Sequence, residues 1–536
     1  MKKARSTRTA METLARGSNP QPAVAVFSLL ALVLPLVLPQ LRAQNSNALL
    51  QEGIRAFQSR DFASAVKVFC VLAQRQPTAA NFNFLATADV GAGNVRDAVK
   101  NFQKSIQLGN KSASVHYNLG LAYIQLQQTA AAIRELKEAL AQDPKYVPAR
   151  YALGVTLLNS GHPREAVADL SEARTQAPHE PQIWARLVSA QFEAADSDQA
   201  LETAQNAMQA IPENARLAVT LATVCIRYQK LQAARNFLED AYELMPDDPE
   251  IKLLLAKVSL LAGEPIEALA VLNGVPPGPK SDAERLILLG EARALTGNLA
   301  AATEDMTTAV KDSPHDPRAI EASAWLQELS GHYAEAIATL EKAKILDPNT
   351  PFIPYRIGVS RYFLGQLPEA KQACEEAARM DTKFAPARVL LGIIKLQQQD
   401  YAGARQSLKE AIVLDPSNAL FHREYGNALL QSGNLPEARQ ELQTALKLDP
   451  KAPEGYFLRA KVLDRLGSRQ AAIEGLKTAI ELKPDYTDAY AELSRLYTED
   501  GQTQQAAAIL AKLKTIKTSS RADQRQLLRA LPDTTH

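Results

Sequence analysis

The segment Tyr425–Pro450 reads YGNALLQSGNLPEARQELQTALKLDP and predicts two short amphipathic helices joined by a turn. In each half, apolar and small residues recur at spacings of three and four, which places them on one helix face. Gly433 separates the halves, because Gly readily adopts the left-handed backbone that ends a helix. Pro450 ends the second helix, since it has no N–H with which to continue one. Helices of about a dozen residues are marginal alone in water, so the pair must pack against another part of the protein.

The Ala at position 438 recurs throughout the sequence. Ala98 and Ala506 are separated by 408 residues, which is twelve steps of 34, and Ala65 adds one repeat 33 residues before Ala98. The sequence therefore contains fourteen repeats that cover about residues 46–520. The recurring positions are Ala65, Ala98, Ala132, Ala166, Ala200, Ala234, Ala268, Ala302, Ala336, Ala370, Ala404, Ala438, Ala472 and Ala506.

Two other positions follow the same period. Most repeats have Gly or Ala twelve residues before the recurring Ala, and most have Pro twelve residues after it. Small residues at both positions let the two helices of a repeat approach closely, and Pro ends the second helix. The early glycines are Gly120, Gly154, Gly290, Gly358, Gly392 and Gly426, and the prolines are Pro77, Pro144, Pro178, Pro212, Pro246, Pro314, Pro348, Pro416, Pro450 and Pro484.

This pattern of a small residue, a Gly turn, Ala, Leu, Ala and Pro over 34 residues resembles the tetratricopeptide repeat. The resemblance implies an all-α fold, an α-solenoid in which about fourteen helix-turn-helix repeats form a right-handed superhelix. Each helix pair would bury its apolar face against the next pair, so the stack has no single core. A long coiled coil is excluded, because Gly and Pro interrupt the pattern in every repeat.

Two segments depart from the pattern. Pro276, Pro277 and Pro279 fall in the second helix of the seventh repeat and are expected to truncate it, because Pro ends a helix. This break is either a tolerated local feature or a joint between two halves, repeats 1–7 (residues 46–279) and repeats 8–14 (280–520). Residues 521–536 are more polar and basic and are expected to form a capping helix and tail.

The N-terminus has the order of a secretory signal peptide. The basic residues Lys2, Lys3, Arg5, Arg8 and Arg16 precede an apolar run, Ala23–Leu38, and Ala43 follows as a small residue. We expect cleavage after Ala43 and export to the periplasm or the extracellular space, with no membrane span in the mature protein. The alternative is an uncleaved signal that anchors the protein in the inner membrane. The resemblance is therefore to exported bacterial tetratricopeptide repeat proteins.

The net charge and the number of cysteines indicate whether nucleic acid or a disulfide framework is expected. The 536 residues include 60 basic and 59 acidic side chains, for a net charge of +1. A nucleic-acid-binding protein usually shows a basic excess, so nucleic acid is not expected as a partner. The three cysteines, Cys70, Cys225 and Cys374, are too few and too widely spaced for a disulfide framework.

The sequence contains no recognisable catalytic constellation. It has no Gly-rich phosphate loop after a strand, no HExxH, no GxSxG and no CxxC, the spacings that hold phosphates, metals or nucleophiles in common enzyme classes. The repeats also leave no length for a separate catalytic domain. We therefore predict a protein that is not an enzyme and binds no cofactor or metal, and a small-molecule ligand is not expected.

The resemblance also implies where a partner binds. In this family the first helix of each pair lines the concave surface, and some members use Lys, Asn and Arg there to clamp a terminal carboxylate. Arg423 and Asn427 match the first part of such a clamp, but Leu458 stands where an Asn would follow. The predicted partner-binding residues are Trp325, Tyr355, Arg356, Tyr362, Tyr117, Tyr151, Arg423 and Asn427.

The aromatic members of this set have two interpretations, because aromatic residues on helices serve either as core or as contact surface. As contact surface they would receive an extended segment or a helix of a protein partner. The predicted function is a non-enzymatic scaffold or assembly factor of the bacterial cell envelope. The alternative is a carbohydrate-associated role, such as exopolysaccharide export or assembly, in which aromatic faces stack on sugar rings.

Overall fold

The computed structural model describes residues 43–278 and 282–516, and within them every regular element is an α-helix. These residues form 28 helices, α3 to α30, which make fourteen pairs, one for each predicted repeat. The prediction of an all-α solenoid is confirmed. The predicted signal peptide, except for Ala43 at the start of α3, and the predicted capping segment 521–536 lie outside the described residues.

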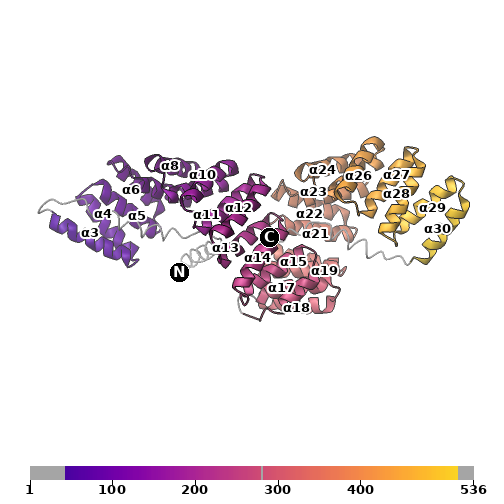
Figure 1. The fold of residues 1–536 in the computed structure, drawn as a ribbon, viewed down its shortest axis with the longest axis horizontal. Coiled ribbons are helices and arrows are strands. Elements are labelled where there is room, and N and C mark those ends of the chain that lie inside the picture. The colour runs from indigo at the N-terminus through magenta and orange to yellow at the C-terminus, as the bar shows by residue number, and fades with distance from the viewer. Residues whose placement is uncertain (1–42, 279–281, 517–536) are drawn as a thin grey trace. The chain divides into compact units, whose positions relative to one another are not determined.

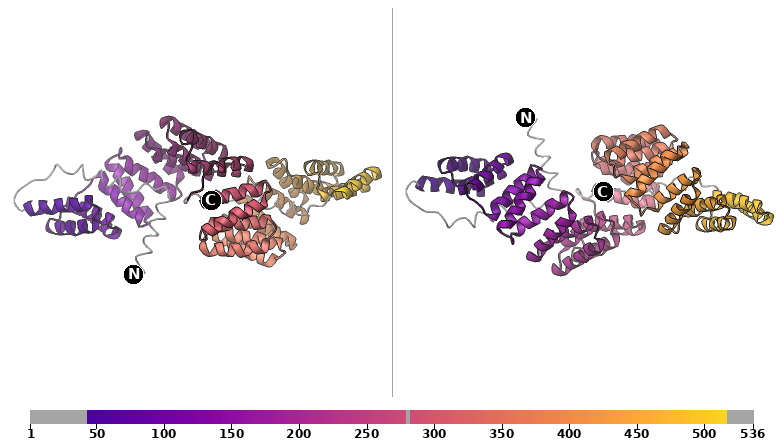
Figure 2. Two further views of the ribbon diagram at one scale, coloured as in Figure 1. Left: turned by 90° about the horizontal axis from the view of Figure 1, so that it is seen from below. Right: turned by 90° about the horizontal axis from the view of Figure 1, so that it is seen from above.

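The protein divides between Pro246 and Asp247 into two compact units. Within each unit the helices lie side by side in sequence order (Figures 1 and 2). The N-terminal unit contains α3 (Ala43–Gln58), α4 (Phe62–Arg75), α5 (Ala79–Gly91), α6 (Val95–Gln107), α7 (Ala113–Gln125), α8 (Thr129–Gln142), α9 (Val147–Asn159), α10 (Pro163–Gln176), α11 (Pro181–Glu193), α12 (Ser197–Ala210), α13 (Ala215–Arg227) and α14 (Leu231–Leu244).

The C-terminal unit holds repeats seven to fourteen. Its helices are α15 (Pro249–Leu261), α16 (Pro265–Leu272), α17 (Asp282–Leu295), α18 (Leu299–Asp312), α19 (Pro317–Leu329), α20 (Tyr333–Leu346), α21 (Phe352–Phe363), α22 (Leu367–Met380), α23 (Ala385–Gln397), α24 (Tyr401–Leu414), α25 (Ala419–Gln431), α26 (Leu435–Leu448), α27 (Pro453–Arg465), α28 (Arg469–Leu482), α29 (Thr487–Glu499) and α30 (Thr503–Thr515).

The segment Tyr425–Pro450 forms its turn as the sequence predicts. Gly433 adopts a φ of 82°, in the left-handed region that favours Gly, between α25 and α26. Pro436 stands in the first turn of α26, where its missing N–H removes no helical hydrogen bond. The helices of this repeat are therefore ended and restarted by local backbone chemistry.

The recurring small residues lie where the two helices of a repeat are closest. Each recurring Ala is fully buried except Ala506, which is 4% exposed. A Cβ added to Gly426 would lie 2.6 Å from Leu442 Cγ, and one added to Gly392 would lie 2.5 Å from Leu408 Cγ. These distances are shorter than any normal carbon contact, so only Gly fits without a shift of the opposite Leu. The expected close approach of the two helices is confirmed.

The apolar interior is a series of small clusters, each shared by neighbouring repeats. One such cluster joins Leu429 of α25, Leu442 of α26 and Val462 of α27. Such an arrangement makes stability approximately a sum of repeat and interface contributions. Damage to one interface is therefore expected to stay local.

The seventh repeat is shortened as the prolines predict. Its second helix, α16, has 8 residues, whereas α14 and α18 each have 14. Buried Val275, beyond the end of α16, joins Leu272 and Leu288 in one cluster. A joint at residue 279 stays a prediction, because residues 279–281 are not described.

Two of the three cysteines belong to the interior. Cys225 and Cys374 are buried, and all three cysteines are free thiols. Burial raises the pKa of the Cys225 thiol to about 12 and raises that of Cys374 as well. Both thiols are therefore protonated at neutral pH and act as small apolar side chains.

Candidate functional site

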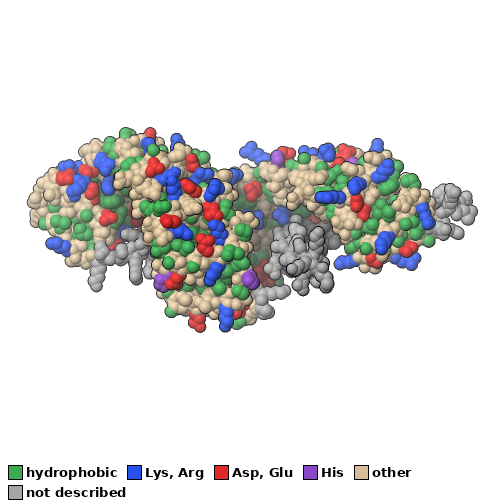
Figure 3. Space-filling view, turned by 180° about the vertical axis from the view of Figure 1, so that it is seen from behind, with side chains coloured by type: hydrophobic (Ala, Val, Ile, Leu, Met, Phe, Trp, Pro, Cys, Tyr) green, Lys and Arg blue, Asp and Glu red, His purple; other side chains and the backbone are tan. Residues whose placement is uncertain are grey.

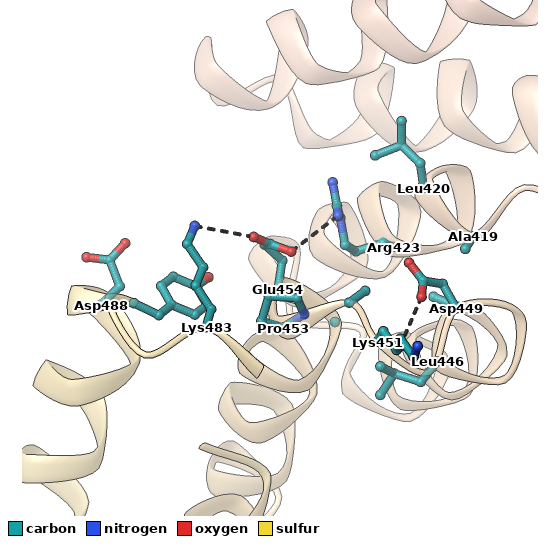
Figure 4. A pocket seen from close by; sticks show the side chains of 14 residues that line it. Ala419, Leu420, Arg423, Leu446, Asp449, Lys451, Pro453, Glu454, Lys483 and Asp488 are labelled. Carbon is teal, nitrogen blue, oxygen red and sulfur yellow. Dashed lines mark hydrogen bonds and ion pairs between the residues drawn. The ribbon is translucent and has the colours of Figure 1, made fainter. Parts of the chain in front are cut away.

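A polar pocket of about 330 Å³ lies in the C-terminal unit at the junction of repeats twelve, thirteen and fourteen. Arg423 lines it from the first turns of α25, Glu454 from the first turn of α27, and Lys483 from the residue that follows α28 (Figure 4). Figure 4 shows the carboxylate of Glu454 between the two cationic side chains. Asp488 of α29 also lines the pocket, so three consecutive repeats contribute to it.

Local turns fix the residues that line this pocket. Asp449 follows the last residue of α26, and its Oδ1 accepts a hydrogen bond from the backbone N–H of Lys451 at 3.0 Å. This Asx-type turn reverses the backbone. Pro453 then begins α27, a position at which Pro is favoured. The turn and the Pro together place Glu454 on the pocket wall.

The Glu454 carboxylate makes only long contacts with the two cations of the pocket. Lys483 Nζ lies 3.7 Å from Glu454 Oε1, and Arg423 Nη1 lies 3.8 Å from Glu454 Oε2. Charge-assisted N–H···O hydrogen bonds are about 2.7–2.9 Å long, so these contacts are ion pairs without hydrogen bonds. Glu454 Oε2 is buried and accepts no hydrogen bond. Arg423 is paired closely with Glu424 instead: its Nε donates to Glu424 Oε1 at 3.0 Å, and its Nη2 lies 3.0 Å from the same oxygen.

Of the predicted partner-binding residues, Arg423 lines this pocket and Asn427 lies one turn further along α25. Residues four apart share a helix face. Asn427 is half-buried, and its Oδ1 accepts a hydrogen bond from Gln431 Nε2 at 3.3 Å. Leu458 packs against the apolar cluster of repeats twelve and thirteen. The pocket therefore combines one predicted residue, Arg423, with Glu454 and Lys483, which were not predicted.

A second group of predicted residues forms a buried cluster between repeats nine and ten. Arg356 of α21 is 6% exposed and Glu328 of α19 is 2% exposed. Arg356 donates to Glu328 Oε2 from Nη2 at 2.7 Å and from Nε at 3.2 Å, and Ser360 Oγ donates to Glu328 Oε1 at 2.8 Å. Arg356 Nη1 also donates to the backbone oxygen of Glu321 at 3.1 Å. This network ties α21 to α19.

The aromatic residues near this network are packed to different extents. Tyr355 is 2% exposed, and its ring makes an edge contact with Phe384 at 5.4 Å between centroids. Tyr362 and Trp325 are partly buried against the apolar clusters of their own repeats. Burial raises the pKa of Tyr362, and the nearby Glu424 carboxylate raises it further. The role of these side chains in partner binding stays a prediction.

Tyr117 and Tyr151 lie in the N-terminal unit on α7 and α9, and both pack against one cluster. The Tyr117 ring meets Tyr146 edge-on at 5.5 Å, and burial raises its pKa to about 12. Burial also raises the pKa of Tyr151, while Arg186 lowers it. The structure brings these two tyrosines together, but their role in binding also stays a prediction.

Neither a metal cluster nor a membrane helix is present in the part of the protein that the structure describes. No group of three or more His, Cys, Asp or Glu side chains there is placed to hold a metal ion. No helix in the same residues is long and apolar enough to cross a membrane. Lys and Arg are interspersed with Asp and Glu over the face shown in Figure 3.

Two sequence models described as tetratricopeptide repeat match the protein. One matches residues 287–351, 355–419 and 389–453, and the other matches residues 89–153, 123–187, 226–290 and 465–531. The protein belongs to the tetratricopeptide repeat family. Tetratricopeptide repeats are typical of non-catalytic scaffolds for protein–protein interaction, and proteins that carry them bind protein partners.

Two solved structures are similar to this tetratricopeptide repeat protein. The crystal structure of the APC/C hetero-tetramer Cut9-Hcn1 is 14% identical, and the match spans 85% of this chain and 97% of that chain with a TM-score of 0.45. The crystal structure of MamA protein is 21% identical, and the match spans 31% of this chain and 92% of that chain with a TM-score of 0.30. No curated protein matches the sequence.

Proposed function

We propose that this tetratricopeptide repeat protein is a non-enzymatic scaffold that holds an extended segment or a helix of a protein partner at the pocket of repeats twelve to fourteen. The observation that carries the proposal is the Glu454 carboxylate on the wall of a pocket of about 330 Å³: its Oε2 accepts no hydrogen bond, and Arg423 Nη1 lies 3.8 Å from it. A carboxylate oxygen that accepts no hydrogen bond is available to a donor of a partner. A few convergent polar groups in a pocket of this size are typical of binding sites.

The scaffold is further proposed to act in the bacterial cell envelope after export. The support is the order of basic residues, apolar run and small residue in the first 43 residues, which is that of a secretory signal peptide. N-terminal sequencing of the envelope fraction should begin at Gln44. A protein that retains Met1 and is embedded in the inner membrane would instead establish the anchored alternative.

The binding proposal is tested by a photo-crosslinking amino acid at Asn427, one turn from Arg423 on α25. The matched control carries the same group at Gln443, which is exposed on α26. The expected result is a covalent protein adduct from position 427 that disappears when Arg423 and Lys483 are both replaced by Glu, with no such adduct from position 443. Equal adducts from both positions would refute the site. A glycan adduct at 427 would favour the carbohydrate-associated role.

A further inference from the structure

The end of the shortened helix α16 carries a chemically reactive dipeptide, Asn273–Gly274. This is the only Asn–Gly pair in the 536-residue sequence. Both residues are exposed, and Asn273 is the residue that caps the C-terminus of α16. We propose that Asn273 is a site of spontaneous deamidation, a covalent modification that needs only water and hydroxide.

The reaction balances without an oxidant or an enzyme. Hydroxide removes the proton of the Gly274 amide, and that nitrogen attacks Cγ of Asn273 to form a new C–N bond. The bond between Cγ and Nδ2 of Asn273 breaks and the nitrogen leaves as ammonia, which gives a five-membered succinimide. Water then opens the ring at one carbonyl or the other, so the products are Asp or isoaspartate. Gly favours the step because it has no side chain to block the approach.

The structure places one restraint on the attacking nitrogen. The Gly274 N–H donates to the backbone oxygen of Val271 at 3.0 Å, and this bond must open before the amide can lose its proton. It lies at the end of a helix of 8 residues with both residues exposed. Opening at such an end requires only local loss of structure, so the restraint slows the reaction without preventing it.

Deamidation of Asn273 changes both the charge and the backbone length next to the buried residues Leu272 and Val275. Either product adds a negative charge at the C-terminus of α16, where the helix dipole disfavours it. Isoaspartate also inserts one methylene into the backbone between Leu272 and Val275, which are both buried in the cluster that joins α15, α16 and α17. Lys252 Nζ donates to the backbone oxygen of Gly274 at 3.3 Å, a contact that the longer backbone displaces. The modification therefore loosens the interface between repeats seven and eight.

The test is incubation of the full-length protein in mildly alkaline buffer followed by peptide mass spectrometry. The peptide that contains Asn273 should gain the mass difference between a hydroxyl and an amino group, about 1 dalton, and should do so faster as the pH rises. Asn298 is an internal reference, because it is exposed but followed by Leu299. It should change several-fold more slowly.

Gly274→Ala is the matched variant. A Cβ at this position would lie 3.4 Å from the Val271 oxygen, an ordinary contact, and Gly274 does not have a positive φ, so the variant is expected to fold. It should slow the mass gain at Asn273 several-fold, and hydrogen exchange of the aged wild type should show lost protection in α15, α16 and α17 only. An unchanged rate in the variant, or no mass gain at Asn273 while Asn298 reacts, would overturn the proposal.

Discussion

The two arginine clusters of the C-terminal unit differ in how tightly their ion pairs join neighbouring repeats. Arg356 and Glu328, between repeats nine and ten, are buried and joined by hydrogen bonds of 2.7 and 3.2 Å. Arg423 and Glu454, between repeats twelve and thirteen, are 3.8 Å apart at a pocket wall. Both arginines are on first helices of their repeats. The Arg356–Glu328 pair is thus hydrogen-bonded between repeats, whereas Arg423 donates its short hydrogen bond to Glu424 of its own helix and leaves Glu454 Oε2 without one.

The physical reason lies in the cost of removing charge from water. A buried ion has lost its hydration and depends on its partner, so loss of that partner leaves an uncompensated charge. A partly exposed ion keeps part of its hydration and gains little from a nearby opposite charge. The Arg356 cluster should therefore matter for folding, and the Arg423 cluster should matter for binding.

The largest expected effect comes from Glu328→Ala, which leaves Arg356 buried without its carboxylate. Loss of one partner of a buried pair typically lowers the free energy of unfolding by ~3–5 kcal/mol. Denaturant unfolding monitored by circular dichroism measures this change. The control is Glu474→Ala, which removes an exposed pair with Lys477 and should cost at most ~1 kcal/mol. If the two variants lose equal stability, the Glu328 pair is no more structural than a surface pair.

A smaller effect is expected from Ala438→Leu, which tests packing in the repeat that holds Arg423. Ala438 is fully buried between two helices, so the larger side chain overpacks the interface and should cost ~1–3 kcal/mol. Hydrogen exchange should show lost protection in repeats eleven to thirteen, because each repeat contacts mainly its neighbours. Ala402→Leu is the control, since Ala402 is exposed on α24. Equal loss of protection in all described repeats would contradict the local picture.

The packing of the two helices within each repeat could be predicted from the sequence. The two helices of each repeat approach each other closely at the same place. The 34-residue period therefore locates the buried Ala of every repeat, and it also locates Gly426 and Gly392, which face Leu442 and Leu408. The shortened α16 could also be predicted, because Pro ends a helix whatever surrounds it. These features depend on local backbone chemistry and on helix spacing alone.

The ion pairs of the pocket and of the buried cluster could not be predicted in the same way. Glu454 and Lys483 are 29 residues apart and do not occupy the same position of the repeat, so the period gives no signal that they meet. Their contact depends on the turn made by Asp449 and on the end of α28. Arg356 lies two residues before the recurring Gly358 and Arg423 lies three residues before Gly426, but this offset does not tell which arginine meets a buried carboxylate such as Glu328 on the neighbouring first helix.

The smallest effect on stability is expected at the pocket, where Arg423→Gln and Lys483→Gln each remove one of the two cations that lie 3.8 and 3.7 Å from the Glu454 carboxylate. Each change should alter the free energy of unfolding by less than ~1 kcal/mol, as is usual for partly exposed pairs. Crosslinking of the partner from position 427 should nevertheless fall sharply, because truncating a central charged contact typically costs ~2 kcal/mol of binding. Added salt should weaken the wild-type complex in the same assay, since it screens exposed charges. Lys477→Gln, which removes a surface charge that does not line the pocket, should leave crosslinking unchanged. If Arg423→Gln instead destabilises the protein as strongly as Glu328→Ala, its charge is structural and the distinction between the two clusters is lost.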